Sequence, residues 1–244
     1  MRNGRRCTAI VLSAGSGSRM KSKVAKQYLP LGGRPLICHA LQAIQQSSVI
    51  DDCVLVTGKE DLEYVQQEIV EKYHFSKVDF CVAGGDERCF SVWNALDAIQ
   101  KGKLTVPNGD GLVFIHDGAR PFLTEEILER TAEAAENFHA CVAAVPTKDT
   151  VKLADEENFA AETPDRRRVW SVQTPQVFDT KLVIRAYSLL MEQEEKVRRK
   201  EIPVTDDAGV VEYFTRERVK LVEGSYRNLK ITTPEDLKIA EALL

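Results

Sequence analysis

Short apolar strand patterns alternate with helical patterns along most of this chain. Strand-like runs occupy residues 7–12, 54–56, 78–82, 111–115 and 141–145, and apolar stripes at helical spacing occupy 37–44, 62–69, 92–99 and 125–137. This alternation predicts an α/β fold, with a Rossmann-like, mostly parallel sheet sandwiched by helices. Ligands of such sheets lie beyond the carboxyl ends of the strands, so the loops after the strands are the places to look for chemistry.

The alternation lapses between residues 146 and 175, where the chain is polar and carries prolines. We expect an excursion from the main sheet there, with 146–168 as an extended β-arm on a single domain that spans 1–244. A helix around 183–190, strands at 220–224 and 227–232, and a last helix complete the expected elements. Thr233 as the cap, Pro234 in the first helical position and Asp236 in capping-box spacing specify the start of that last helix.

Charge and cysteine usage exclude several classes of protein. Lys and Arg number 33 against 37 Asp and Glu, a net charge of −4, so no general basic excess would draw the 244-residue chain onto nucleic acid or an anionic membrane. No run approaches the roughly 20 apolar residues that a membrane span needs. The six cysteines are scattered without a C-x-x-C pair, which predicts buried thiols rather than a zinc site or a disulfide framework. We expect a cytoplasmic protein.

The loop 13–26, SAGSGSRMKSKVAK, follows the first strand and is the first candidate binding segment. Its glycines, Gly15 and Gly17, allow backbone N–H groups to approach a phosphate, and its lysines and Arg19 supply positive charge. Met20 stands where a dinucleotide fingerprint needs a third glycine, and no G-K-[ST] follows as in a Walker loop. The loop therefore indicates either a triphosphate site or an ordinary glycine-rich turn.

The segment HDGARP stands at the end of the strand pattern 111–115, and we expect it to bring Asp117 and Arg120 to the ligand edge of the sheet. Asp117 could orient a hydroxyl or hold a metal, and Arg120 could bind a phosphate through two hydrogen bonds. The alternative is a local Asp117–Arg120 pair that only stiffens the turn. We interpret His116 as a core residue rather than as a base.

Five further polar positions are candidates, and three of them lie in loops or at strand ends. Thr205 has the pattern of a helix cap, and Lys230 lies within an apolar strand pattern, from which it must point to solvent or to a site. The other three are Thr150, Arg166 and Thr174.

Seven sequence blocks, taken together, resemble one enzyme family. They are AGSGSRM with KQYLPLGGRPL, GGDER followed by Ser91, HDGARP, PTKDTVK, WSVQTPQVF, TDDAGVVE and NLKITTPEDL. The chain is similar in these blocks, and in their order from about residue 7 to 244, to 2-C-methyl-D-erythritol 4-phosphate cytidylyltransferases of non-mevalonate isoprenoid synthesis. The resemblance implies a fold of the nucleotide-diphospho-sugar transferase type. It also implies that CTP and methylerythritol phosphate react, with a divalent metal, usually magnesium, on the triphosphate.

The resemblance also implies roles for individual residues. Arg19 and Lys26 match the positions that stabilise the pentavalent phosphorus, and Arg166 and Lys230 match those that position methylerythritol phosphate. Further contacts to that substrate match Asp117, Arg120, Thr150, Thr174 and Thr205. The cytosine pocket matches Ala14 and Gly15, with Gly17 in the same loop, and Gly85, Asp86 and Ser91. No metal ligand is assigned, since the phosphates would hold the magnesium, and the arm would embrace the partner subunit of a homodimer.

Two departures from the family pattern are Ala25, where proline usually precedes the lysine, and Gly118, where alanine is usual. Neither removes a functional group, so only loop rigidity is affected. The expected chemistry agrees with the residue types, because an ionised phosphate oxygen needs no strong base to attack, whereas the charge that develops needs cations.

Three other functions are alternatives to this one. Ribitol 5-phosphate cytidylyltransferases share most of the blocks but commonly carry AGG, KQFL and HDSVRP. A nicotinamide-dependent oxidoreductase would need the third glycine and an acidic residue after the second strand, where Val56, Thr57 and Gly58 stand instead. A non-catalytic nucleotide-binding protein is the alternative from another class, and it should have lost the pair Arg19 and Lys26.

Overall fold

A mixed, mostly parallel sheet forms the centre of the molecule, as the sequence predicts. The computed structural model describes residues 1–15 and 25–244. Within them seven strands pair in the order β11-β7-β10-β6-β1-β4-β5. Their bounds are β1 Cys7–Ser13, β4 Asp52–Thr57, β5 Val78–Ala83, β6 Leu112–Asp117, β7 Ala140–Pro146, β10 Trp170–Asp179 and β11 Lys220–Glu223. Only β10, among these strands, runs antiparallel to its neighbours, β6 and β7.

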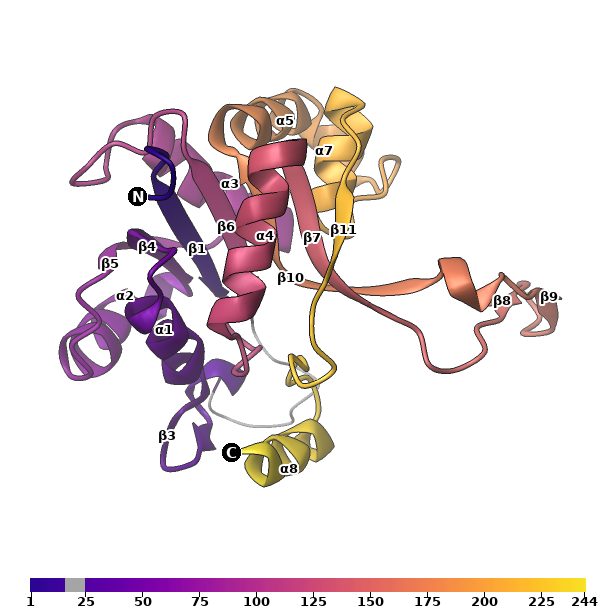
Figure 1. Cartoon of the computed structure of the whole chain (residues 1–244), viewed down its shortest axis with the longest axis horizontal. Coiled ribbons are helices and arrows are strands. Elements are labelled where there is room, and N and C mark those ends of the chain that lie inside the picture. The colour runs from indigo at the N-terminus through magenta and orange to yellow at the C-terminus, as the bar shows by residue number, and fades with distance from the viewer. Residues whose placement is uncertain (16–24) are drawn as a thin grey trace.

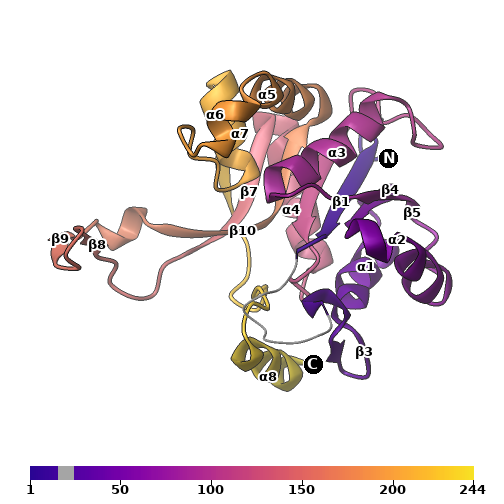
Figure 2. The same ribbon diagram turned by 180° about the vertical axis from the view of Figure 1, so that it is seen from behind.

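Helices cover both faces of this sheet (Figures 1 and 2). On one face lie α1 (Leu36–Gln46), α2 (Leu62–Tyr64) with the π-helical η4 (Val65–Glu71), and α4 (Glu125–Phe138). The other face carries α3 (Arg88–Gln100), α5 (Thr180–Glu192), α6 (Glu194–Arg198) and α7 (Asp207–Thr215). None of the helices in residues 1–15 and 25–244 is long and apolar enough to span a membrane.

The remaining elements are short. They are the single-turn helices η2 (Lys26–Tyr28) and η3 (Lys59–Asp61), the small pair β2 (Pro30–Leu31) and β3 (Arg34–Pro35), and α8 (Pro234–Leu243). At α8 the expected capping box is present, with Thr233 and Asp236 bonded to each other's backbone and Pro234 in the first turn.

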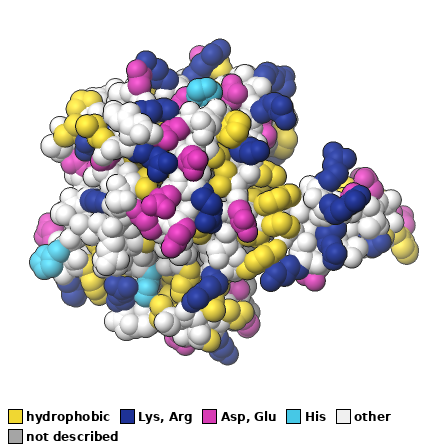
Figure 3. All heavy atoms as spheres, viewed as in Figure 1, with side chains coloured by type: hydrophobic (Ala, Val, Ile, Leu, Met, Phe, Trp, Pro, Cys, Tyr) yellow, Lys and Arg dark blue, Asp and Glu magenta, His cyan; other side chains and the backbone are white. Residues whose placement is uncertain are grey.

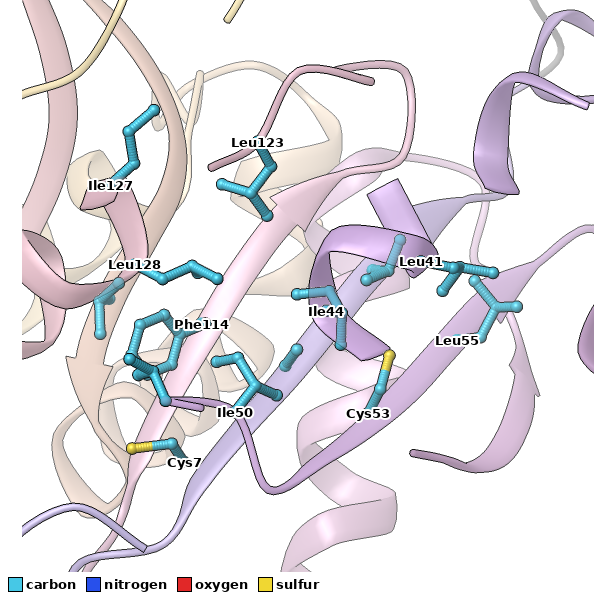
Figure 4. Packing of buried hydrophobic residues seen from close by; sticks show 14 of the residues in the cluster. Cys7, Leu41, Ile44, Ile50, Cys53, Leu55, Phe114, Leu123, Ile127 and Leu128 are labelled. Carbon is cyan, nitrogen blue, oxygen red and sulfur yellow. The ribbon is translucent and has the colours of Figure 1, made fainter. Parts of the chain in front are cut away.

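Alternate side chains of the central strands enter the two halves of the core. Cys7, Ala9 and Val11 of β1 pack on the α1 and α4 side, whereas Ile10 packs on the α3 and α5 side. Phe114 and Leu55 lie between sheet and helices with Ile44 and Leu128 (Figure 4). The six cysteines are free thiols, and burial raises the pKa of each.

Between β7 and β10 the chain leaves the body as an arm (Figure 1). The arm carries the short antiparallel pair β8 (Leu153–Ala154) and β9 (Ala160–Glu162), and the single-turn helix η5 (Arg166–Arg168). Lys and Arg side chains gather on it, and a narrow neck separates it from the body in this view (Figure 3). Leu153 and Phe159 on the arm are exposed large apolar side chains, at 49% and 67% of their surface.

The sequence-based elements need three corrections. The segment 227–232, expected as a strand, is a loop. Its buried Ile231 donates its backbone N–H to Ala119 O, in the loop after β6, and does not join a strand of the sheet. The excursion expected up to residue 175 ends earlier, since Trp170 already pairs with Pro146 in the sheet. The helix expected over 62–69 is largely π-helical.

Candidate active site

Loops after β1, β5 and β6 meet at a cavity of about 380 Å³, which we call the first cavity. Parallel strands bring their carboxyl ends to this edge, and that is why segments so far apart in sequence converge. Eight of the predicted site residues line this cavity: Ala14, Gly15, Lys26, Gly85, Asp86, Ser91, Asp117 and Lys230.

Close backbone packing shapes one wall of the first cavity. A Cβ atom at Gly84 would lie 2.4 Å from Ala14 Cβ and 2.9 Å from Ser91 Oγ, and one at Gly85 would lie 2.6 Å from Phe90 Cβ. Ser91 Oγ accepts a hydrogen bond of 3.0 Å from Gly85 N. Glycine is therefore required for these loops to approach each other, and the wall consists mainly of backbone groups.

A second cavity, of about 350 Å³, adjoins the first and shares Arg88, Asp117 and Lys230 with it. Its lining includes three more predicted residues, Arg120, Thr174 and Thr205. Two cavities with a common ionic wall could hold two anionic reactants side by side.

Asp117, at the end of β6, is the centre of that wall. Its Oδ2 accepts from Lys230 Nζ at 2.7 Å and its Oδ1 from Arg88 Nε at 3.3 Å. Burial alone would raise the pKa of Asp117, but the charges of Arg88 and Lys230 more than offset burial and hold this pKa well below its ordinary value. The carboxylate is thus ionised and keeps both cations in place.

Arg120 does not form the local pair with Asp117 that sequence spacing allowed. Its Nη1 donates to Asn228 O at 2.6 Å, and its Nε has no hydrogen-bond partner among the described residues although the side chain is buried. Burial lowers the pKa of Arg120. A buried guanidinium with a donor to spare is suited to an anion in the second cavity.

His116 and Thr174 hold the turn after β6. Thr174 Oγ1 accepts from Asp117 N at 3.0 Å and lies 3.0 Å from His116 Nδ1, while His116 Nε2 lies 3.1 Å from Arg120 O. These contacts fit a neutral ring protonated at Nε2, with Thr174 donating to Nδ1. His116 is therefore a satisfied core residue, as interpreted from the sequence.

Two predicted residues lie on the arm and line neither cavity. Thr150 is exposed, and Arg166, also exposed, donates from Nη1 to Lys148 O at 2.9 Å. Two others, Gly17 and Arg19, fall outside the described residues. Lys26 Nζ donates to Ile231 O at 3.3 Å, which ties the first loop to the segment that carries Lys230.

Two details of the site differ from the sequence interpretation. Thr205 does not cap the following helix, because Asp206 takes that place, accepting from Gly209 N at 2.8 Å. Lys230 extends from a loop rather than from a strand. In both cases the residue still faces the second cavity.

Sequence reasoning missed Arg88 and Asp207. Asp207 has no exposed surface, and its oxygens accept from Arg88 Nη1 and Nη2 at 2.8 and 2.7 Å. Arg88 belongs to the block GGDER, so its position beside Gly85 and Asp86 was an available signal. Asp207 resembles an ordinary first-turn acid in the sequence, and only the packing of α7 on α5, with the Arg88 side chain against it, buries it.

The carboxylates around the first cavity do not form a metal cage. Glu87 pairs with Lys200 at 3.0 Å, Asp86 with Arg198 at 3.4 Å, and Asp117 with its two cations. In residues 1–15 and 25–244 no group of three His, Cys, Asp or Glu side chains could hold a metal ion.

Comparison with known proteins identifies the family. The family model of 2-C-methyl-D-erythritol 4-phosphate cytidylyltransferase matches residues 7–244. The chain belongs to this family. A cytidylyltransferase of that name from Lachnospira eligens is 45% identical over 237 residues, which cover 97% of this chain and 98% of the relative. The sequence-based family assignment, and with it the class of nucleotidyltransferases, is therefore confirmed.

Solved cytidylyltransferase structures share the fold. The 4-diphosphocytidyl-2C-methyl-D-erythritol synthase from Anaerococcus prevotii is 37% identical, with a TM-score of 0.80, over 98% of this chain and 96% of that one. The cytidylyltransferase from Thermus thermophilus is 29% identical, with a TM-score of 0.71, over 96% of both chains.

The two departures from the usual cytidylyltransferase pattern fit their surroundings. Ala25 has φ −59°, a value that proline also adopts, so proline at this position would fit the same backbone. A Cβ at position 118 would lie 2.4 Å from Ile37 Cδ1 and 2.9 Å from Leu12 O. Glycine at 118 therefore allows the turn after β6 to pack tightly on the sheet.

Stability should depend on pH through His116. Burial lowers its pKa from 6.5 to about 4 in the folded protein. The unfolded chain therefore binds the proton more readily, so the contribution of the neutral ring is complete above about pH 6.5 and falls as the pH drops toward 4, by about 3 kcal/mol. Urea unfolding of wild type and His116→Gln at pH 7 and 4.5 should show a larger loss for wild type.

The exposed His74 provides the control, because His74→Asn should leave the pH dependence of unfolding unchanged. Equal losses of stability in wild type and His116→Gln would contradict the assignment of a neutral, buried His116.

Proposed function

We propose that this chain transfers the cytidylyl group of CTP to 2-C-methyl-D-erythritol 4-phosphate, releasing pyrophosphate, in non-mevalonate isoprenoid biosynthesis. The observation that carries the proposal is the ionic wall of Arg88, Asp117 and Lys230, which joins the two cavities. Family membership supplies the substrates, and the cavities supply a place for each: CTP in the first, the alditol phosphate in the second.

The reaction needs charge stabilisation more than proton transfer. A phosphate oxygen of the alditol substrate attacks the α-phosphorus of CTP, the new P–O bond forms, and the bond to the β-phosphate breaks with pyrophosphate as leaving group. Negative charge grows on the non-bridging oxygens and on the leaving group. Lys26 at the first cavity, with Arg19, would offset that charge, and magnesium on the triphosphate would neutralise more of it.

Lys230 and Arg120 would orient the incoming phosphate. Lys230 borders both cavities, and Arg120 lines the second one with a buried Nε that has no hydrogen-bond partner among the described residues. Thr205 also lines the second cavity, whereas Thr174 is committed to His116 and Asp117 N and would act by holding their turn. The backbone wall at Gly85 and Ser91, with Ala14, Gly15 and Asp86, would receive the cytosine base.

The substrate assignment is tested by pyrophosphate release. Purified protein with CTP and Mg²⁺ should release pyrophosphate with methylerythritol phosphate and much more slowly with ribitol 5-phosphate. A clear preference for ribitol 5-phosphate would select the alternative cytidylyltransferase. Release with neither alditol phosphate would favour the non-catalytic nucleotide-binding alternative.

Lys26→Ala should lower kcat by about 10²–10³-fold, as the loss of one preorganised cation does in comparable sites. The fold should be kept, which circular dichroism and thermal melting would verify. Lys101→Ala removes an exposed lysine paired only with Asp97 on the surface of α3, and it should leave kcat unchanged. Near-normal turnover of Lys26→Ala would remove Lys26 from the mechanism.

We further propose a homodimer in which the arm, residues 146–168, supplies Arg166 and Thr150 to the partner's second cavity. The support is that these two residues line neither cavity of their own chain, while the arm extends from the body with exposed apolar and basic side chains. We also expect a cytoplasmic enzyme, since six free thiols suit a reducing compartment.

Mixing inactive variants tests this arrangement. Lys26→Ala and Arg166→Ala chains, each inactive alone, should regain up to about a quarter of wild-type activity after mixing and subunit exchange, because half of the dimers would carry one intact site. Size-exclusion chromatography would establish that the protein is a dimer. A pull-down through a tag on one variant would establish that the two variants have exchanged subunits. No recovery in mixed dimers would place Arg166 in its own chain's site or outside any site.

A further inference from the structure

Arg88 occupies an unusual place, because it lines both cavities and also bonds to a carboxylate behind them. It is the first residue of α3, and its side chain is 30% exposed toward the cavities. Its contacts divide into an anchor on α7 and a contact to Asp117.

The anchor is a buried acid with three donors. Asp207 accepts from both terminal nitrogens of Arg88, and its Oδ1 also accepts from the Tyr187 hydroxyl of α5 at 2.5 Å. Tyr187 and Asp207 are both completely buried. A carboxylate in such a place is stable only while its partners hold it, so Arg88 and Asp207 fix each other's position.

The remaining contact of Arg88 reaches the site. Its Nε donates to Asp117 Oδ1, and the other oxygen of Asp117 accepts from Lys230 Nζ. A guanidinium has donors at its end and along its side in one rigid plane, so it can bind Asp207 with one edge and Asp117 with another. A lysine ammonium at position 88 could not keep both geometries.

On the basis of the function proposed above, we infer that Arg88 is a positioning residue: fixed by Asp207 and Tyr187, it orients Asp117, and Asp117 in turn keeps the Lys230 ammonium between the two substrate cavities. The chain of contacts links α5 and α7, on one face of the sheet, to the loop that carries Lys230. A change at the buried end should therefore alter catalysis without removing any group that touches substrate.

The test compares three variants with wild type in the pyrophosphate assay. Arg88→Lys keeps the positive charge but loses the planar guanidinium with donors on two edges. Tyr187→Phe removes the hydroxyl that donates to Asp207, and Arg88→Gln removes the positive charge. Arg199→Lys is the matched control, because Arg199 pairs with Glu195 at 3.6 Å on the exposed surface.

Arg88→Lys should lower kcat by about 10²-fold, the scale of a small misplacement of a catalytic group. Tyr187→Phe should lower it less, and Arg199→Lys not at all. Each kcat is referred to the folded fraction measured by circular dichroism, so a merely structural ion pair would lower the melting temperature and leave these values at the wild-type level.

The pH profile provides a second readout. The charged and titratable groups that face Asp117 are Arg88, Lys230, Arg120 and His116. Without the charge of Arg88, Asp117 should take up a proton at higher pH and release Lys230. The acid limb of kcat/KM should therefore move to higher pH in Arg88→Gln, and remain unchanged in Arg199→Lys.

If the wild type is active and both Arg88→Lys and Tyr187→Phe have the wild-type kcat, the positioning role of Arg88 is wrong, while the proposed cytidylyl transfer stands. An inactive wild type would overturn the proposed cytidylyl transfer and, with it, this role of Arg88. If Arg88→Gln does not fold, the other two variants still decide the question.

Discussion

The ion cluster at Asp117 is the interaction on which the site depends. Two cations from distant segments, Arg88 and Lys230, meet on one carboxylate at the end of a central strand. Removing a charge from its water is unfavourable unless close partners replace the water, and here the partners come from α3 and the loop after β11. The cluster therefore joins three parts of the chain at the edge where ligands of an α/β sheet lie.

Buried polar groups around this cluster are paired almost throughout. Thr174 Oγ1 bonds to His116 and to Asp117 N, and Thr174 O accepts from Asn228 Nδ2, although Asn228 Oδ1 has no partner among the described residues. Arg120 is the exception that matters for function, since its Nε lacks a partner within the described residues. A buried cation with an unpartnered donor beside a cavity is suited to bind an anion.

The arm represents a different use of the chain. It buries little against its own body, and its exposed leucine, phenylalanine and arginines offer no stability to an isolated subunit. The proposed homodimer would give these exposed side chains a partner surface to cover them.

The sequence by itself determined the alternation of strands and helices, the capped start of α8 and the family, because hydrophobic periodicity, caps and motif blocks are local patterns. It also indicated most of the residues that line the cavities, since these follow the strands. Only the tertiary structure decided that Asp207 is buried, that Arg88 bridges it to Asp117, and that 227–232 is a loop. Those features depend on contacts between segments more than a hundred residues apart, such as Arg88 and Asp207, which no local pattern encodes.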